Sequence, residues 1–383
     1  MAMNIPYGRQ EIDEEDIASV VRVLRSDYLT SGPEIERFEQ EFAQTVGAKH
    51  AIAVSNGTAA LHLAMIVAGV KNGDRVLTSP NTFLASANAA IYVGATPDFA
   101  DIDPTSGNLT AASLEAAWQP DVRAVVPVAY AGQAPDMADI YQLAKSRGAV
   151  VIEDACHGTG GGFSHHGKLH KLGGHPFADI SIFSFHPVKT MTTAEGGMLT
   201  TDNEEMANRI RLLRNHGMVR EPVQFQGSLP DYGPWTYEMQ ELGYNYRMTD
   251  IQAALGASQL GRIDEFIQRR NEIALTYRRE LANLPVELPP GAPDGWRHGY
   301  HLFPIAVENR AEVFRALREQ GIGVQVHYVP IHHHPISAHM GFGVGDLPVC
   351  DALYERLISL PVHPGLSDED QRVVIGALAR CLR

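Results

Sequence analysis

Short apolar segments of strand length alternate with segments of helical periodicity between residues 50 and 183. Strands are expected at residues 50–54, 75–78, 122–128, 149–154 and 179–183, and helices at residues 59–69 and 83–93. This alternation is typical of parallel sheets that are covered by helices on both faces. The sequence therefore predicts a large α/β domain.

The chain changes character near residue 250. Thr249 and Asp250 form an N-cap pair that precedes a long amphipathic segment, expected to be a helix connecting two domains. After it we expect a Pro/Gly-rich loop at 288–295, strands at 301–307 and 324–328, a helix at 310–319, and a last helix capped by Ser367. We therefore predict a large domain at residues 1–250, and a connector helix with a smaller α+β domain at residues 251–383.

Composition excludes several classes of function. The 383 residues carry 31 Lys and Arg against 45 Asp and Glu, and the resulting net charge of −14 disfavours binding to nucleic acid or to an anionic membrane. The three cysteines cannot form a disulfide framework. No segment approaches about 18 uninterrupted apolar residues, and the first residues do not resemble a signal peptide. We therefore expect a cytoplasmic protein with no nucleic-acid or membrane partner.

Two motifs follow expected strands. Residues 55–61, Ser-Asn-Gly-Thr-Ala-Ala-Leu, precede an expected helix, whose free N–H groups and dipole can bind a phosphate, although an ordinary Asn-Gly turn is the alternative. Residues 153–157, Glu-Asp-Ala-Cys-His, place Asp154 at the end of a buried strand. A carboxylate there can keep the pyridine nitrogen of pyridoxal phosphate protonated, and a strand-end Asp that caps the next turn is the alternative. Cys156 is interpreted as a small buried apolar residue.

Lys189 lies in a compact and mostly apolar loop. Ser-Ile-Phe-Ser-Phe-His-Pro-Val precedes it at residues 181–188, and Thr-Thr-Ala-Glu-Gly-Gly follows at residues 192–197. Burial in such a loop lowers the pKa of a lysine amine and makes it available for a Schiff base. Most lysines are instead solvated surface charges, and this alternative remains open here.

Together and in this order, these motifs resemble the sugar aminotransferases of the DegT/DnrJ/EryC1/StrS family. The resemblance extends from about residue 5 to the C-terminus, and it includes Gly-Tyr-Asn-Tyr-Arg-Met-Thr-Asp at residues 243–250. Residues 215–218, 235–239, 321–330 and 358–361 are similar to the branch that aminates UDP-4-keto-6-deoxy-N-acetyl-altrosamine on the way to pseudaminic acid. The resemblance implies the aspartate-aminotransferase fold, the type I fold of pyridoxal-phosphate enzymes, with a mostly parallel seven-stranded sheet in the large domain.

The resemblance also implies roles for individual residues. Lys189 would bind the cofactor and transfer the proton, and Asp154 would hold the pyridinium nitrogen. Further cofactor contacts are implied for Gly57, Thr58, Phe83, His157, Ser184 and Asn245, with Asn245 coming from the second subunit of a homodimer. Substrate contacts are implied for Tyr7, Thr30, His186, Arg247 and His327. The implied reaction moves an amino group from L-glutamate to the C4 ketone of a nucleotide-linked 4-keto-6-deoxy sugar.

Residues 160–175 depart from the family pattern, because this segment is longer and richer in His than the short Gly-rich turn expected there. With His332, His333 and His334 it raises the question of a metal site, but none of the spacings gives a familiar ligand pair, and we predict no metal.

Three functions remain open. They are a nucleotide-sugar aminotransferase, with dTDP- or GDP-linked sugars as alternative acceptors, a dehydratase that uses the same cofactor, and a non-catalytic ligand-binding homologue. The dehydratase branch resembles this fold with a His in place of the lysine. Lys189 therefore favours transamination.

Overall fold

A computed structural model describes residues 5–227, 230 and 232–382 of the chain. Its centre is a seven-stranded sheet in the order β1-β9-β8-β5-β4-β2-β3. The strands are β1 (His50–Val54), β2 (Arg75–Thr78), β3 (Thr96–Phe99), β4 (Val122–Val126), β5 (Val150–Asp154), β8 (Ile180–Ser184) and β9 (Gly197–Thr201). Only β9 runs antiparallel to its neighbours, β1 and β8. The predicted mostly parallel seven-stranded sheet is confirmed.

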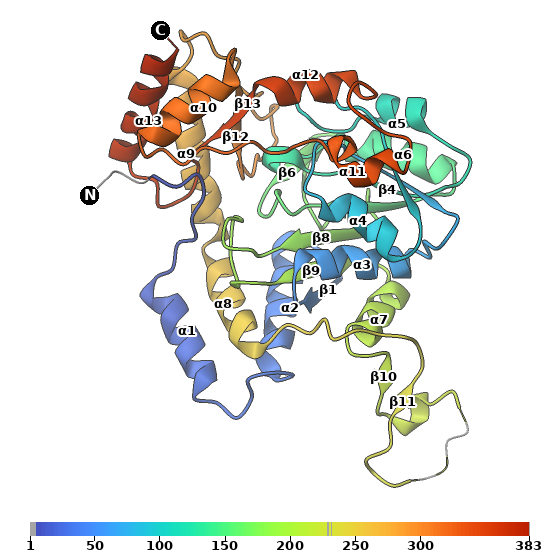
Figure 1. Ribbon diagram of the computed structural model, residues 1–383. Coiled ribbons are helices and arrows are strands. Elements are labelled where there is room, and N and C mark those ends of the chain that lie inside the picture. The colour runs from blue at the N-terminus through green and yellow to red at the C-terminus, as the bar shows by residue number, and fades with distance from the viewer. Residues whose placement is uncertain (1–4, 228–229, 231, 383) are drawn as a thin grey trace.

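Helices pack on both faces of this sheet (Figure 1). One face is covered by α2 (Pro33–Val46), α5 (Ala111–Ala117), α6 (Met137–Ser146) and α8 (Asp250–Gly261), and the other by α3 (Gly57–Val67), α4 (Ala85–Tyr92) and α7 (Glu204–Leu213). Strand residues alternate between the two cores: Ala51 and Ala53 belong to one, and Ile52 and Val54 to the other. Continuous apolar runs are therefore needed in these strands, because both of their faces are buried.

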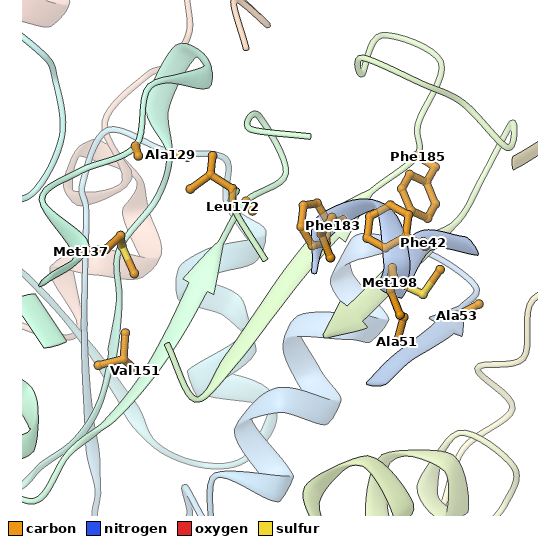
Figure 2. Packing of buried hydrophobic residues seen from close by; sticks show 14 of the residues in the cluster. Phe42, Ala51, Ala53, Ala129, Met137, Val151, Leu172, Phe183, Phe185 and Met198 are labelled. Carbon is orange, nitrogen blue, oxygen red and sulfur yellow. The ribbon is translucent and has the colours of Figure 1, made fainter. Parts of the chain in front are cut away.

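Aromatic rings fill the first of these cores. Phe42 of α2 lies 4.9 Å from Phe183 and 5.6 Å from Phe185 between ring centroids, and all three rings are fully buried. They gather next to Ala51, Ala53 and Met198 (Figure 2). Each buried Phe side chain contributes about 1.5–3 kcal/mol to stability, so this cluster anchors α2 to the strands that carry the site.

The expected connector helix is two helices. α8 ends at Gly261, and α9 (Ile263–Glu280) begins after Arg262, whose backbone is not helical. The Arg262 side chain donates to Asp16 of α1 (Glu14–Leu24) at 2.5 Å. The break lets α8 pack against α1 and α2, whereas α9 packs in the C-terminal part of the chain. Amphipathic periodicity continues across such a break, and the sequence therefore predicted one helix.

The C-terminal part has its own core around α9. It contains β12 (Phe303–Ala306) paired antiparallel with β13 (Leu357–Leu360), together with α10 (Arg310–Glu319) and α13 (Asp368–Cys381). The helix α12 (Pro348–Arg356) packs instead with Phe99 and Ile102 in a separate cluster. The expected strand at residues 324–328 is wrong. Only Gln325 forms a bridge, to Ser359, because the backbone of His327 is instead held by the hydroxyl of Tyr130 at 2.7 Å. The domain boundary at residue 250 remains a prediction.

Smaller elements lie outside these cores. β10 (Met218–Val219) and β11 (Glu238–Met239) pair on an extension that protrudes from the body of the molecule (Figure 1). The His-rich segment forms a hairpin of β6 (Gly162–His165) and β7 (Lys168–Lys171). The remaining short helices are η1 (Tyr130–Gly132), η2 (Pro222–Gln224), η3 (Ile331–His333) and α11 (Pro335–Ala338). None of the helices among the described residues is long and apolar enough to cross a membrane.

Candidate active site

The predicted cofactor residues lie at one edge of the sheet, where β5 and β8 end and α3 begins. Asp154 is the last residue of β5, Ser184 is the last residue of β8, and Gly57 is the first residue of α3. Lys189 follows β8 in a short loop. Because β5 and β8 are parallel, their carboxyl ends meet at the same edge, which is the usual binding edge of such sheets.

Asp154 is buried and held by two hydrogen bonds. Its Oδ2 accepts from the Ser86 hydroxyl at 2.8 Å, and its Oδ1 accepts from the backbone N–H of Cys156 at 3.1 Å. Ser86 is in turn 3.1 Å from the Thr82 hydroxyl. These contacts fix the orientation of the carboxylate, as an acceptor for a protonated ring nitrogen requires.

Lys189 is half-buried, and its Nζ has no hydrogen-bond partner within the described part of the chain. Burial lowers the pKa of its amine, while the charges of Cys156 and Asp154 act in the opposite direction. The charge of Lys189 also contributes to lowering the pKa of His157, His301 and His327. This lysine is therefore not a solvated surface charge, and its amine is suited to nucleophilic attack.

The start of α3 packs directly against the end of β8. A Cβ on Gly57 would lie 2.9 Å from Cβ and 3.3 Å from Oγ of Ser184, so only glycine lets the first turn of α3 approach Ser184 this closely. Asn56 caps α3 by accepting from the N–H of Ala59 at 2.8 Å. Gly57 and Thr58 are the first two residues of α3, and the first N–H groups of a helix have no partner within it.

A wall of uncharged rings borders Lys189. His157 Nε2 lies 3.0 Å from the hydroxyl of Tyr328, and its ring packs on that of His301 with 4.3 Å between centroids. Burial, with a smaller contribution from Lys189, lowers the pKa of both histidines well below the usual value. The Nδ1 atoms of both are buried and unpartnered within the described structure. His301 was missed by the sequence reasoning, and its only signal was a polar residue at the start of an apolar strand.

Other predicted residues complete this wall. His327 Nδ1 lies 2.9 Å from the Ser359 hydroxyl, and the His327 ring is 5.2 Å from that of Tyr7. Burial and the charge of Lys189 lower the pKa of His327 to about 4. Phe83 is 56% exposed, with its ring 6.2 Å from that of Tyr328, so a planar ligand can stack on it. His186 is exposed, and its carbonyl accepts from the backbone N–H of Lys189 at 2.8 Å.

Three predicted residues form a separate group. Arg247 donates to the side chain of Asn215 at 2.8 Å, Asn245 pairs with the backbone of Asn215, and Thr30 pairs with Thr249. Arg247 lines a cavity of about 570 Å³ together with Lys49, Arg211, Arg214, Ser31 and Gly32. Within the described residues of a single chain, no hydrogen bond joins Thr30, Asn245 or Arg247 to Lys189 or Asp154.

The sequence predicts no metal site, but among the described residues one group of side chains outside the cofactor site could hold a metal ion. His332 and His333 do not join the His-rich hairpin but approach Asp351 of α12.

Comparison with known proteins agrees with this geometry. Residues 10–379 match the DegT/DnrJ/EryC1/StrS aminotransferase family. The spore coat polysaccharide biosynthesis protein SpsC of Bacillus subtilis is 41% identical over 382 residues, covering 98% of this chain and 96% of that protein. The UDP-4-amino-4,6-dideoxy-N-acetyl-beta-L-altrosamine transaminase of Campylobacter jejuni is 36% identical over 378 residues, covering 97% and 95%.

Solved structures give the same result. Helicobacter pylori PseC, an aminotransferase of pseudaminic acid biosynthesis, has a TM-score of 0.89 at 30% identity and 99% coverage of both chains. The putative sugar aminotransferase Spr1654 of Streptococcus pneumoniae, in its PMP form, has a TM-score of 0.91 at 29% identity, also with 99% coverage of both chains.

The site also fits pyridoxal phosphate chemically. Lys189 provides an amine of lowered pKa, Asp154 provides an oriented carboxylate, and the first turn of α3 at Gly57 and Thr58 provides backbone N–H groups for a phosphate. The chain belongs to the DegT/DnrJ/EryC1/StrS aminotransferase family, and it is a pyridoxal-phosphate-dependent sugar aminotransferase.

Proposed function

We propose that this enzyme transfers the amino group of L-glutamate to the C4 ketone of a UDP-linked 4-keto-6-deoxy sugar, namely UDP-4-keto-6-deoxy-N-acetyl-altrosamine. The observation that carries the transfer is Lys189, whose amine has a lowered pKa beside Asp154. The names of the Campylobacter jejuni relative and of PseC support the choice of sugar, and SpsC supports a place in polysaccharide biosynthesis.

Different residues carry out different parts of the transamination. Pyridoxal phosphate, when bound, supplies an electron sink that stabilises negative charge at the reacting carbon. The Lys189 Nζ would hold the cofactor when substrate is absent and would serve as the base that takes a proton from the carbon of the amino donor. Asp154, oriented by Ser86 and the N–H of Cys156, would hold the ring nitrogen of the cofactor in its protonated form.

The uncharged wall supports a sugar ring as the acceptor. His157, His301 and His327 have lowered pKa values and are neutral near pH 7. Neutral imidazoles with the hydroxyls of Tyr7 and Tyr328 recognise hydroxyl and acetamido groups through hydrogen bonds rather than through charge. A site of this kind rejects a sugar that leaves its buried polar groups unpaired.

The separate group of Thr30, Asn245 and Arg247 supports a homodimer with shared active sites. These residues have no hydrogen bond to Lys189 or Asp154 within the described part of one chain, and the extension that follows α7 exposes Trp235 by 71% and Leu242 by 74%. Large exposed apolar side chains on one segment are typical of an interaction surface. We propose that a second copy covers them, and that the enzyme acts in the cytoplasm. Light scattering should give twice the mass of 41.8 kDa.

The first experiment follows the visible absorption of the cofactor-loaded enzyme. Addition of L-glutamate should bleach the band of the wild type, while Lys189→Ala should give no band that glutamate bleaches. Lys168→Ala changes an exposed lysine of the β6–β7 hairpin and should behave as the wild type. A wild type that no amino donor bleaches would refute transamination and favour elimination or ligand binding.

The second experiment tests the acceptor. The glutamate-treated enzyme is mixed with the UDP-linked altrosamine ketone or with dTDP- and GDP-linked 4-keto-6-deoxyhexoses. Return of the band together with an amino sugar in the mass spectrum should occur with the UDP sugar. Amination of only a dTDP or GDP sugar would replace the proposed substrate, and a product that has lost water would indicate a dehydratase.

A further inference from the structure

Two adjacent histidines and one aspartate converge outside the cofactor site. Nε2 of His332 lies 2.7 Å from Asp351 Oδ1, and Nε2 of His333 lies 2.6 Å from the same oxygen. The histidines end η3, whereas Asp351 lies in the first turn of α12. The ligand atoms of the three residues all lie within 4.8 Å of one another.

The surroundings of this cluster are anionic and open on one side. His332 is 1% exposed, whereas the side chains of His333 and Asp351 are each 14% exposed. Burial lowers the pKa of His332, and the carboxylates of Asp351 and Asp101 act in the opposite direction. Asp101 is itself fixed, since it accepts from the N–H groups of Val349 and Cys350 at 2.9 Å each.

We propose that His332, His333 and Asp351 bind a divalent transition-metal ion of the Zn²⁺ class. Two imidazole nitrogens and one carboxylate oxygen are a ligand set that suits zinc, with solvent completing the coordination from the open side. Asp351 is oriented for this role, because its Oδ2 accepts from the N–H of Gly345 at 2.7 Å.

The geometry sets the change that binding requires. Tetrahedral ligands about 2.0–2.2 Å from zinc stand about 3.3–3.6 Å apart. The imidazole nitrogens are now 2.6 and 2.7 Å from the carboxylate oxygen, so each of these separations must widen by about 0.6–1 Å when the metal binds. His333 and Asp351 are partly exposed, whereas the side chain of His332 is fully buried, so the movement falls on His333 and Asp351.

One feature limits the affinity. When a metal occupies Nε2 of His332, the ring proton resides on Nδ1, which is buried and has no acceptor among the described residues. Loss of such an outer partner lowers metal affinity by about 10–100-fold, so we expect a weaker site than a dedicated structural zinc site.

Binding would join α12 to the segment that follows Tyr328. His332 is the fourth residue after Tyr328 in sequence, and the Tyr328 hydroxyl lies 3.0 Å from His157 in the active site. The expected role is therefore structural, and the site does not depend on the proposed sugar substrate.

The test uses cobalt as a spectroscopic probe. The full-length enzyme is treated with a chelator, dialysed and titrated with Co²⁺, and the visible d–d absorption is followed in the cofactor-free form. We expect one Co²⁺ per chain, displaced by Zn²⁺. Asp351→Asn and His333→Gln should each weaken binding at least tenfold. His339→Gln changes an exposed histidine of the same loop and should leave binding unchanged.

Two outcomes would overturn the proposal: no Co²⁺ bound by the wild type, or equal binding by the wild type, Asp351→Asn and His333→Gln. Circular dichroism checks that each variant is folded. If Asp351→Asn unfolds, the comparison of His333→Gln with His339→Gln decides the matter, because His333 is partly exposed and its replacement keeps a polar side chain.

Discussion

Replacement of Gly57 by alanine tests the phosphate site by the addition of one methyl group. The new Cβ would lie 2.9 Å from Cβ of Ser184, whereas carbon atoms in contact stand about 3.5–4.0 Å apart. The helix must therefore move by about 0.6–1 Å, and overpacking of this kind costs about 1–3 kcal/mol. The alanine regains about 0.4–1 kcal/mol by restricting the unfolded chain. The free energy of unfolding should fall by up to about 2.6 kcal/mol as the balance of these two effects.

Gly261→Ala is the matched control. Gly261 is also helical, its backbone suits an L residue, and a Cβ there meets nothing within 4 Å. Urea unfolding of the cofactor-free proteins should separate the two variants by about 1–3 kcal/mol. Titration with pyridoxal phosphate should show that Gly57→Ala binds the cofactor at least about tenfold more weakly than the wild type. This corresponds to a loss of about 1.4 kcal/mol or more in binding free energy. Equal stability and equal affinity in the two variants would refute the assignment of the start of α3 to the phosphate.

Three further predictions follow from the same site. Ser86→Ala removes a hydrogen bond to the buried Asp154 carboxylate and should lower the free energy of unfolding by about 1.5–3 kcal/mol, with no such loss for the exposed Ser146→Ala. The pKa of His327 is about 4 in the folded protein, so between pH 6.5 and pH 4 the unfolded chain binds a proton that the folded chain does not. The contribution of His327 to the free energy of unfolding should therefore be complete above pH 6.5 and fall by up to about 3 kcal/mol towards pH 4. Urea unfolding of the wild type at several pH values should show this loss, and His327→Gln should show a weaker dependence of stability on pH. The rate at which the visible band forms on mixing with pyridoxal phosphate should rise with pH. The midpoint of this pH dependence should lie below the ordinary lysine pKa of about 10.4, because burial lowers the pKa of Lys189. A midpoint at or above that value would contradict the role of Lys189 as the reacting amine.

Much of the large domain could be predicted because its signals are local. β2 matches its predicted range, and α8 begins at Asp250 because Thr249 accepts from the N–H of Gln252 three residues later. The antiparallel strand β9 was not identified. Its place between β1 and β8 depends on pairing with segments far away in sequence, such as Ile52 with Leu199.

The candidate site was predictable to a similar extent. The residues at strand ends, Asp154, Ser184 and Lys189, come together because parallel strands deliver their carboxyl ends to one edge. His301 could not be placed beside His157 from sequence, since 144 positions separate them and no periodicity links them. The roles implied for Thr30, Asn245 and Arg247 remain predictions, because none of them is hydrogen-bonded to Lys189 or Asp154 within the described part of one chain.

The sequence by itself determined the α/β class, the helix caps at Thr249 and Ser367 and the placement of the candidate cofactor residues at strand ends, because hydrophobic period and capping act over a few neighbouring residues. The tertiary structure decided the bend at Arg262, the irregular path of residues 324–328, the neutral wall beside Lys189 and the meeting of His332 and His333 with Asp351. Each of these depends on burial or on contacts between distant segments. The interactions that stabilise these features therefore form only when the chain has folded.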